Sequence, residues 1–177
     1  MSARVIRGGY AVARRCRVAA LLAGVSWGAV VALAAGAAQA QSGPFLYVPN
    51  NNDNNVSVVD TSTNTAGTPI PVGIEPITAG VTGDQSFVYV TNYNSNTVSV
   101  INTATNTVVA TISVGTSPYG VAVTPDGKTV YVANSGSSTV SVITAATNAV
   151  VATITVGTNP VGAAVMTETV LLPELAT

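Results

Sequence analysis

The residue types available for catalysis are few, because histidine is absent and the only cysteine is Cys16. Zinc sites need imidazole or thiolate ligands, and nucleophilic catalysis usually pairs a hydroxyl or thiol with a histidine base. After position 16 the sequence therefore excludes Ser-His-Asp, Cys-His and His-rich metal chemistry. We expect no catalytic residue, no metal ligand and no cofactor-binding residue in this chain.

The carboxylates that remain are scattered along the sequence, and two of them fall in turns. Asp84 and Asp126 lie in equivalent segments of an internal repeat, the second within Pro125-Asp126-Gly127. Aspartate at such a turn accepts hydrogen bonds from nearby backbone N–H groups. The pattern favours a local structural role for both residues over acid–base catalysis.

A run of oxygen-bearing side chains at Asn50–Asn55 is a second candidate for chemistry. Calcium takes about six to eight oxygen ligands, so a loop of this kind could bind it. Only Asp53 is charged, however, and the spaced aspartates of calcium-binding loops are missing. Asparagine also favours tight turns, because it tolerates a left-handed backbone. We interpret the run as a turn, with a calcium loop as the alternative.

The internal repeat, which must position these side chains, has a period of about 42 residues, a spacing typical of solenoids, arrays and propellers. Aligning residues 89–124 with 131–166 gives 24 identities in 36 positions. The repeated features are a Tyr-Val-X-Asn start (Tyr47, Tyr89, Tyr131), a glycine (Gly73, Gly115, Gly157) and a proline (Pro76, Pro118, Pro160). The repeat predicts the architecture but not the ligand.

Each complete unit contains the pattern of four short strands. In the clearest unit these strands are predicted over 120–124, 129–134, 139–143 and 149–154, with turn residues between them. β-Branched residues dominate these runs, and both faces of the predicted strands are apolar, which indicates sheets covered on both sides. We therefore expect an all-β fold, a β-propeller of four-stranded antiparallel blades. A parallel β-helix is the structural alternative.

Four segments of the repeat carry a resemblance to a known family. They are Tyr89–Asn92, Asn96–Ile101, Val108–Ile112 and Thr124–Thr129. They closely resemble the YVTN-type β-propeller repeat, which is common in exported bacterial proteins and archaeal surface-layer proteins. We assign residues 41–170 to three such units. The first unit departs from the pattern at Ala66–Pro71, where two prolines disturb a fourth strand that is expected at the sheet edge.

The strand count predicts about three blades. The strand at 45–49 corresponds to the second of a unit and the strand at 161–166 to the first of a unit, so the order is three strands, four, four and one. Ordinary propellers have about four to eight blades. Because three blades would expose two apolar faces, three outcomes stay open: two chains form a six-bladed ring, the chain is a fragment of a longer propeller, or the stack stays open. Residues 171–177 leave the repeat register and are expected to form an irregular tail.

Residues 1–40 have the pattern of a secretory signal peptide. Five of the six basic residues lie before position 18, an uncharged stretch follows, and Ala38-Gln39-Ala40 fits a cleavage site. An uncleaved membrane anchor is the alternative, because about 20 apolar residues can cross a bilayer. The pattern favours cleavage after Ala40 and export, by the general or the twin-arginine route, to the periplasm or cell surface. We expect no membrane attachment after cleavage.

The composition after this segment limits the partners. Residues 41–177 carry one basic and seven acidic side chains, hence a formal charge of −6. Phosphate backbones need Lys and Arg to displace their counterions, so we expect no nucleic-acid partner. Without cysteine, this part must be held by packing and backbone pairing instead of disulfides.

Function in repeat proteins tends to lie where similar units differ, usually in the loops of one face. The candidate loop-face binding residues on this basis are Asn51, Glu75, Tyr93 and Tyr119. The two tyrosines are the first candidates to test, because exposed tyrosine is favoured in contact surfaces. The alternative interpretation is that all four are ordinary loop residues. The sequence favours a non-catalytic exported scaffold for protein or glycan binding, with homo-oligomerisation as an option. The resemblance also implies an alternative, a propeller fragment of a larger dehydrogenase- or lyase-like enzyme or redox protein.

Overall fold

The computed structural model describes residues 44–166, and every regular element in this range is a β-strand. These residues belong to one compact unit, Ala37–Thr177. The expected signal peptide at 1–40 and the expected tail at 171–177 lie outside the described residues.

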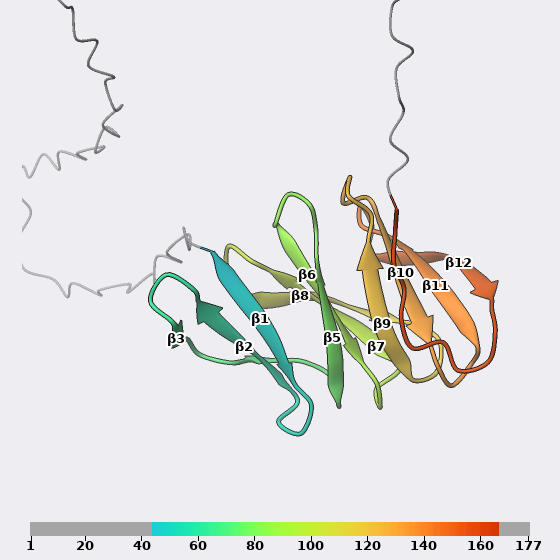
Figure 1. Cartoon of the computed structure of the whole chain (residues 1–177), viewed down its shortest axis with the longest axis horizontal. Coiled ribbons are helices and arrows are strands. Elements are labelled where there is room, and N and C mark those ends of the chain that lie inside the picture. The colour runs from blue at the N-terminus through green and yellow to red at the C-terminus, as the bar shows by residue number, and fades with distance from the viewer. Residues whose placement is uncertain (1–43, 167–177) are drawn as a thin grey trace, which may run out of the picture. The chain divides into compact units, whose positions relative to one another are not determined.

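The strands form three four-stranded antiparallel sheets, the blades (Figure 1). The first contains β1 (Phe45–Asn50), β2 (Asn55–Asp60), β3 (Thr65–Ala66) and β4 (Ile70–Pro71). The second contains β5 (Pro76–Val81), β6 (Phe87–Asn92), β7 (Thr97–Asn102) and β8 (Thr107–Ser113). The third contains β9 (Pro118–Val123), β10 (Thr129–Asn134), β11 (Thr139–Thr144) and β12 (Ala149–Thr155). The all-β prediction of three four-stranded blades is confirmed, and the described residues form a partial β-propeller.

The first residues of the strands in the third blade follow the prediction, with one difference, and the last residues agree to within one position. β10, β11 and β12 begin at the predicted residues, whereas β9 begins two residues earlier. A bulge between Val132 and Asn134 places Pro118 opposite Asn134, which extends β9 toward its N-terminus. Proline is acceptable at this place because it is the first residue of the strand.

The fourth strand of the first blade is broken, as its prolines predict. In the segment that follows β2, only β3 and β4 pair with β2. Between β3 and β4 the one backbone bond to β2 runs from Gly67 N–H to Val58 O, at 2.8 Å. The break lies in the outermost strand of the sheet. No further strand pairs with this strand, so the missing ladder bonds affect no other pairing.

Residues 161–166 form no strand, contrary to the prediction. A first strand in the other units pairs with the second strand of its own blade, as β9 does with β10, and no described strand follows residue 166. The segment lies against β9 instead: a Cβ built on Gly120 would be 2.6 Å from Cα of Gly162. β1 has β2 as its only described strand neighbour, so the described residues do not close the first blade with this segment.

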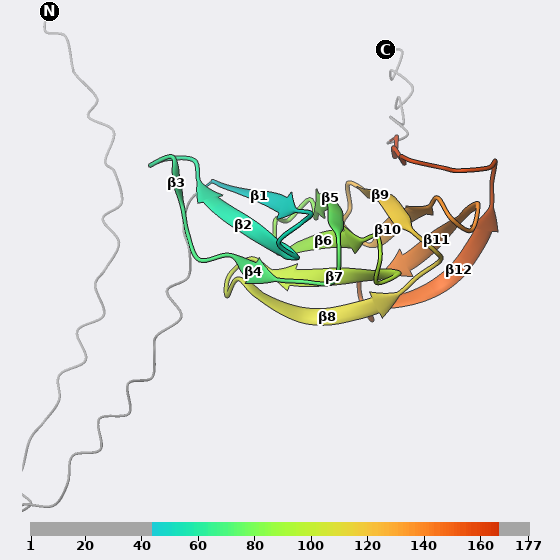
Figure 2. The ribbon, with the colours of Figure 1, turned by 90° about the horizontal axis from the view of Figure 1, so that it is seen from below.

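The three blades follow one another in chain order (Figure 2), and the core side chains lie between consecutive blades. Between the first and second blades it consists of Val56, Val58, Ile70, Val88, Val90 and Ile101. Between the second and third it consists of Tyr89, Val98, Val100, Ile112, Val130, Val132 and Ile143. The second blade is thus buried on both faces, as its two apolar faces predict. Among residues 44–166, the first and third blades each pack against a blade on one face only, and residues 161–163 lie against β9 on the other face of the third blade.

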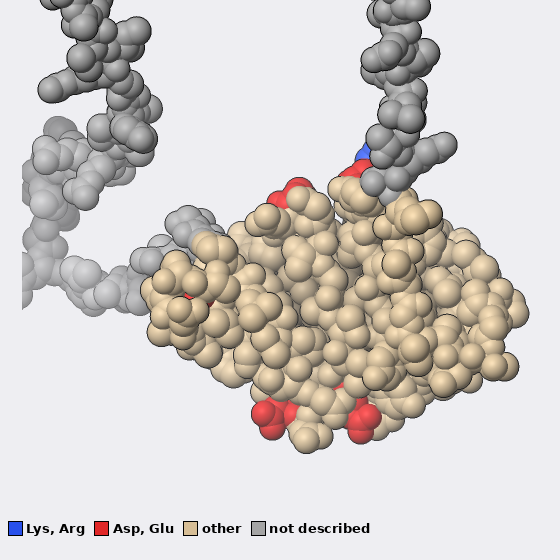
Figure 3. All heavy atoms as spheres, in the orientation of Figure 1, with Lys and Arg blue, Asp and Glu red and all other residues tan. Residues whose placement is uncertain are grey.

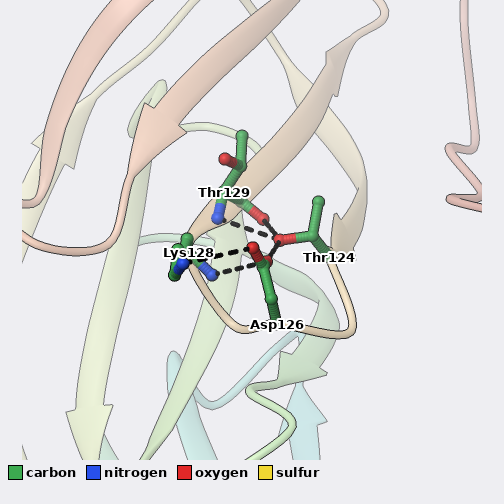
Figure 4. A network of polar contacts seen from close by, with 4 residues as sticks. All are labelled: Thr124, Asp126, Lys128 and Thr129. Atoms are coloured by element: carbon green, nitrogen blue, oxygen red, sulfur yellow. Dashed lines mark hydrogen bonds and ion pairs between the residues drawn. The ribbon is translucent and has the colours of Figure 1, made fainter. Parts of the chain in front are cut away.

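A threonine–aspartate pair closes the first hairpin of both complete blades. In the third blade, Thr124 Oγ1 donates to Asp126 Oδ1 at 2.6 Å (Figure 4). The backbone N–H of Lys128 donates to the same carboxylate oxygen, and that of Thr129 donates to Thr124 Oγ1, each at 3.0 Å. In both pairs the hydrogen bond from the threonine hydroxyl is the main cause that lowers the pKa of Asp84 and Asp126. Both aspartates therefore have the predicted turn role.

Two repeated glycines allow close approach to a buried asparagine. A Cβ on Gly73 would lie 2.7 Å from Cγ of Asn92, and one on Gly115 would lie 2.6 Å from Cγ of Asn134. Both asparagines are fully buried, and each amide donates to a threonine and a serine of the next strand. A larger side chain would displace these bonds, which explains the glycine of the repeat. Gly157, in contrast, has nothing within 4 Å.

Candidate functional site

Tyr93 and Tyr119, from consecutive blades, meet edge to face. Tyr93 directly follows β6, and Tyr119 is the second residue of β9. Their ring centroids are 6.4 Å apart and their planes meet at 89°. The quadrupoles of aromatic rings favour this arrangement. Tyr119 is 39% exposed and Tyr93 is half-buried, so the pair is accessible from solvent.

Backbone and side-chain hydrogen bonds hold both tyrosines in place. The N–H of Tyr93 donates to the carbonyl of Glu75 at 2.9 Å. The hydroxyl of Thr91, which is fully buried, donates to the carbonyl of Tyr119 at 2.8 Å and so ties β6 to β9. The separation of the two rings is therefore set by the sheets and not by mobile loops.

Glu75 has a left-handed backbone, with a φ of 54°. Its N–H donates to Asn54 Oδ1 at 2.9 Å, which anchors the chain between the first two blades. The equivalent residues Ser117 and Asn159 have φ values of 53° and 54°, so the repeat imposes this conformation. It costs a non-glycine residue roughly 1–2 kcal/mol, and asparagine tolerates it best.

These side chains line one cleft of about 290 Å³, which we call the tyrosine cleft. Its lining consists of Glu75, Ile77, Tyr93, Tyr119, Ser135, Asn159 and Val161. The structure thus brings together three of the four candidate residues, Glu75, Tyr93 and Tyr119. The other lining residues occupy repeat positions at which the units differ, so sequence divergence was the signal for them as well.

Asn51, the fourth candidate, does not line the tyrosine cleft. It is exposed in the turn at 51–54, between β1 and β2. Asn54 in this turn has a φ of 54°, which agrees with the predicted turn role of the asparagine run. The residues equivalent to Asn51 in the other units are Tyr93 and Ser135, which do line the cleft. They reach it because an inner strand lies beside them, and the first blade has none in the described chain.

A larger hollow of about 920 Å³ lies between the outer strands of the first two blades. Its lining mixes apolar side chains, such as Phe45, Ile70 and Val108, with threonines and Asn106. Its only charged group is Asp60, whose Oδ1 already accepts bonds from the hydroxyl and the N–H of Ser62. This hollow offers less chemistry than the tyrosine cleft.

Few charges surround the tyrosine cleft. Glu75 is the one ionisable acid in its lining. Lys128 is the only cation between residues 44 and 166, and it forms an exposed ion pair with Asp126 at 4.0 Å. No group of three or more His, Cys, Asp or Glu lies together in that range. Figure 3 shows acidic atoms in small patches, mostly near the margins, and basic atoms beside one of these patches, while the rest of this face is uncharged.

Among the described residues, none forms a helix that is long and apolar enough to cross a membrane.

Comparisons with known proteins agree with the geometry. The sequence model of a family described as YNCE-like beta-propeller matches residues 81–163. Hydrazine synthase of Kuenenia stuttgartiensis is 32% identical with a TM-score of 0.65, over 67% of this chain and 34% of that chain. Apo AztD from Citrobacter koseri is 15% identical with a TM-score of 0.58, over 71% and 35%. Dihydro-heme d1 dehydrogenase NirN, in complex with DHE, is 22% identical with a TM-score of 0.56, over 62% and 24%. No curated protein matches the sequence.

The blades and these matches define the class: the chain is a β-propeller repeat protein. It spans about a third of the length of the hydrazine synthase chain that it resembles. The finer assignment to YVTN-type repeats stays a prediction from the sequence motifs.

Proposed function

We propose that this chain is a non-catalytic, exported β-propeller scaffold whose tyrosine cleft binds a protein or glycan partner. The supporting observation is the edge-to-face pair of Tyr93 and Tyr119 beside Glu75 in one cleft. Binding sites commonly combine apolar walls with a few placed polar groups. The basic, apolar and small-residue pattern of residues 1–40 supports export, which puts the partner in the periplasm or at the cell surface.

The chemistry of the cleft favours a partner that presents a Lys or Arg side chain. A cation is attracted to the face of a tyrosine ring when it lies within about 6 Å of the ring centroid. The carboxylate of Glu75 supplies a charge-assisted acceptor next to the rings. The formal charge of −6 over residues 41–177 adds long-range attraction for a basic partner.

A glycan would use the same cleft differently. Sugar rings stack on aromatic side chains, and their hydroxyl groups would bond to Ser135 and Asn159, which also line the cleft. The charge of Glu75 would then add little to the affinity, because the ligand is neutral. Charge dependence therefore separates the two classes of partner.

Partner capture from cell-envelope extract tests this function. Tyr93→Ala and Tyr119→Ala should each reduce capture by roughly tenfold or more, as truncation of contact tyrosines commonly does. Val109→Ala is the matched control, because it removes a 51% exposed apolar side chain from β8, outside the cleft. Unchanged capture by both tyrosine variants would rule the cleft out as the contact.

Glu75→Gln distinguishes the partner classes. Capture of a basic protein should weaken in this variant, and its salt dependence should become shallower because a charge contact is lost. Capture of a glycan should be unchanged in the variant and should be competed by the free oligosaccharide.

The similarity to hydrazine synthase favours a second candidate function, the propeller part of a larger redox enzyme. In that case the protein isolated from its source should be attached to, or should co-purify with, a catalytic polypeptide that bears a cofactor. Visible absorption that follows the protein through purification would support this candidate. A colourless preparation that still captures its partner would favour the scaffold.

A further inference from the structure

We propose that the tyrosine cleft binds an arginine side chain of a protein partner, with the guanidinium flat on one tyrosine ring and its N–H edge on the carboxylate of Glu75. This assignment rests on the proposed function, in which the cleft captures a partner, and it specifies the side chain that is recognised. Within the described residues, the cleft has an unpaired carboxylate, a hydroxyl whose proton is already used and two aromatic rings at right angles.

The carboxylate of Glu75 is available to a ligand. The backbone N–H and carbonyl of this residue are used, the first by Asn54 and the second by Tyr93. Its side chain, however, has no hydrogen bond or ion pair among residues 44–166. Glu75 is also only partly exposed. A partly desolvated carboxylate attracts a cationic donor more strongly than a fully exposed one does, because water screens the charge less.

The hydroxyl of Ser135 also offers only acceptor capacity. It donates its proton to the carbonyl of Ser117 at 2.8 Å, so only its lone pairs remain for a ligand. The nearby backbone groups are used as well: the N–H of Ser135 bonds to the carbonyl of Ser117, and that of Tyr93 bonds to the carbonyl of Glu75. This wall is therefore best matched by a ligand that brings several N–H donors.

The two tyrosine rings form a right-angled corner. Their planes meet at 89° and their centroids are 6.4 Å apart, so a flat group on the face of one ring meets the other ring with its edge. A guanidinium group is flat, is weakly hydrated for a cation and stacks on aromatic faces. It also has five N–H donors in its plane, so a group stacked on one ring still has an edge free for the carboxylate.

Apolar side chains complete the lining of the cleft. Ile77 and Val161 lie there together with the two rings. The methylene groups of an arginine pack on such surface while the charged head keeps its hydrogen bonds. The volume of about 290 Å³ is at the small end of ligand pockets, which suits one long side chain.

The end of the blades that carries the cleft has acids and no cation among the described residues. Glu75 directly precedes β5, and the β1–β2 turn with Asp53 lies beside it, since Asn54 of that turn accepts its N–H. Lys128 lies in the hairpin after β9, at the opposite end of that strand from Tyr119. No described positive charge therefore opposes the approach of an arginine.

Lysine matches these features less well, although it carries the same charge. Its ammonium group is compact and strongly hydrated, and its three donors point in different directions. It cannot lie flat on a ring or present two parallel N–H groups to the carboxylate of Glu75. We therefore expect the cleft to discriminate between the two basic side chains.

Short peptides test this preference directly. The full-length protein is titrated with acetyl-Gly-Gly-Arg-Gly-Gly-amide, and with the same peptide carrying lysine or citrulline at the centre. Binding is followed by NMR up to roughly 10 mM peptide, because one side chain binds weakly. The arginine peptide should bind roughly fivefold more tightly than the lysine peptide. It should bind roughly tenfold more tightly than the citrulline peptide, which has the same shape without the charge.

Three results of the titrations would overturn the assignment. Equal affinity for arginine and lysine would mean that only charge is recognised. Equal affinity for arginine and citrulline would mean that charge is not recognised. A failure of the arginine peptide to bind within this range would exclude the side chain altogether.

Variants of the two tyrosines test the stacking. Tyr93→Leu and Tyr119→Leu keep apolar bulk but remove the ring, and at least one of them should lower the arginine-to-lysine preference to about twofold or less. Tyr93→Phe and Tyr119→Phe are the matched controls, because they keep the ring, and both should keep the preference. A preference that survives in both leucine variants would contradict stacking.

Variants of two acids test the contact with the carboxylate. Glu75→Gln should weaken the arginine peptide by roughly tenfold and leave the citrulline peptide unchanged, because only the charge is lost. Asp53→Asn is the matched control: it removes an acid from the neighbouring turn that does not line the cleft, and it should weaken the arginine peptide by less than about twofold. Equal weakening by the two variants would assign the effect to the overall field of the protein.

The peptide titrations and partner capture from extract can fail separately. If Tyr93→Ala and Tyr119→Ala lose capture but the original protein binds the arginine and lysine peptides equally, the proposed function stands and the arginine assignment is overturned. If capture is unchanged in both alanine variants while the arginine peptide binds with the expected preference, the cleft recognises arginine and the proposed function fails.

Discussion

The hydroxyl of Tyr89 donates a hydrogen bond to Asn148 Oδ1 at 3.0 Å, across the boundary between the second and third blades. Tyr89 is fully buried, and this burial, with a smaller effect from Asp84, raises the pKa of its hydroxyl. The hydroxyl therefore remains protonated and able to donate at neutral pH. The blades are held together by this repeated polar contact as well as by apolar packing.

Replacing Tyr89 by phenylalanine should lower the free energy of unfolding by about 1 kcal/mol, the net contribution of one hydrogen bond. The ring is retained, so the packing term is unchanged. Urea denaturation measures the effect. Tyr93→Phe is the control, because the hydroxyl of Tyr93 has no hydrogen bond among the described residues, and it should unfold like the original chain. Equal stability of Tyr89→Phe and the original chain would show that the bond contributes nothing.

Gly115→Ala should destabilise the fold by about 1–3 kcal/mol, because overpacking forces neighbours to shift. The new Cβ would meet Asn134 and Ser137 side-chain atoms at 2.6 Å. Gly67→Ala provides the comparison, since its nearest neighbour is a backbone oxygen at 3.6 Å. Thermal unfolding should separate the two variants clearly, and the same melting temperature for both would refute the steric explanation.

Glu75→Asn should stabilise the chain by roughly 1 kcal/mol, because asparagine tolerates the left-handed backbone better than glutamate does. Glu75→Gln removes the charge but keeps the unfavourable backbone preference, so its stability should stay near that of the original chain. Chemical denaturation of both variants decides the point. A gain in Glu75→Gln equal to that in Glu75→Asn would assign the effect to charge instead.

The stability should decrease at both ends of the pH range. Hydrogen bonds lower the pKa of Asp60, Asp84 and Asp126 below the ordinary 3.8, led by the hydroxyls of Ser62, Thr82 and Thr124. The unfolded chain therefore takes up protons first as the pH falls, and this stabilisation is lost below about pH 4. Burial raises the pKa of Tyr47 and Tyr89 above 10.0, so the unfolded chain loses protons first above about pH 10.

Melting temperatures from pH 3 to pH 11 check both directions. The double variant Asp84→Asn, Asp126→Asn should show a shallower decrease on the acid side. On the alkaline side the decrease should change only slightly, because Asp84 is the smaller of the two causes that raise the pKa of Tyr89. An unchanged acid slope in this variant would mean that other groups control the acid transition.

Much of the fold was predictable because its contacts are local. The β6–β7 and β10–β11 hairpins pair residues that are near in sequence, so turn residues and apolar alternation specify their register. The prolines at Ala66–Pro71 likewise predicted the broken strand, because proline removes a ladder donor wherever it stands. Because the unit is repeated, the same sequence pattern predicted all three blades.

The sequence by itself determined the repeating unit, its strands and the stacking of blades. The residues of each unit specify both the pairing between adjacent strands and the two apolar faces that must be buried. Only the tertiary structure decided that Tyr93 and Tyr119 share a cleft with Glu75 while Asn51 does not, because these residues come from different blades and meet through packing between them. It also decided that residues 161–166 form no strand. A strand exists only where a second strand supplies its hydrogen bonds, and no described strand pairs with this segment.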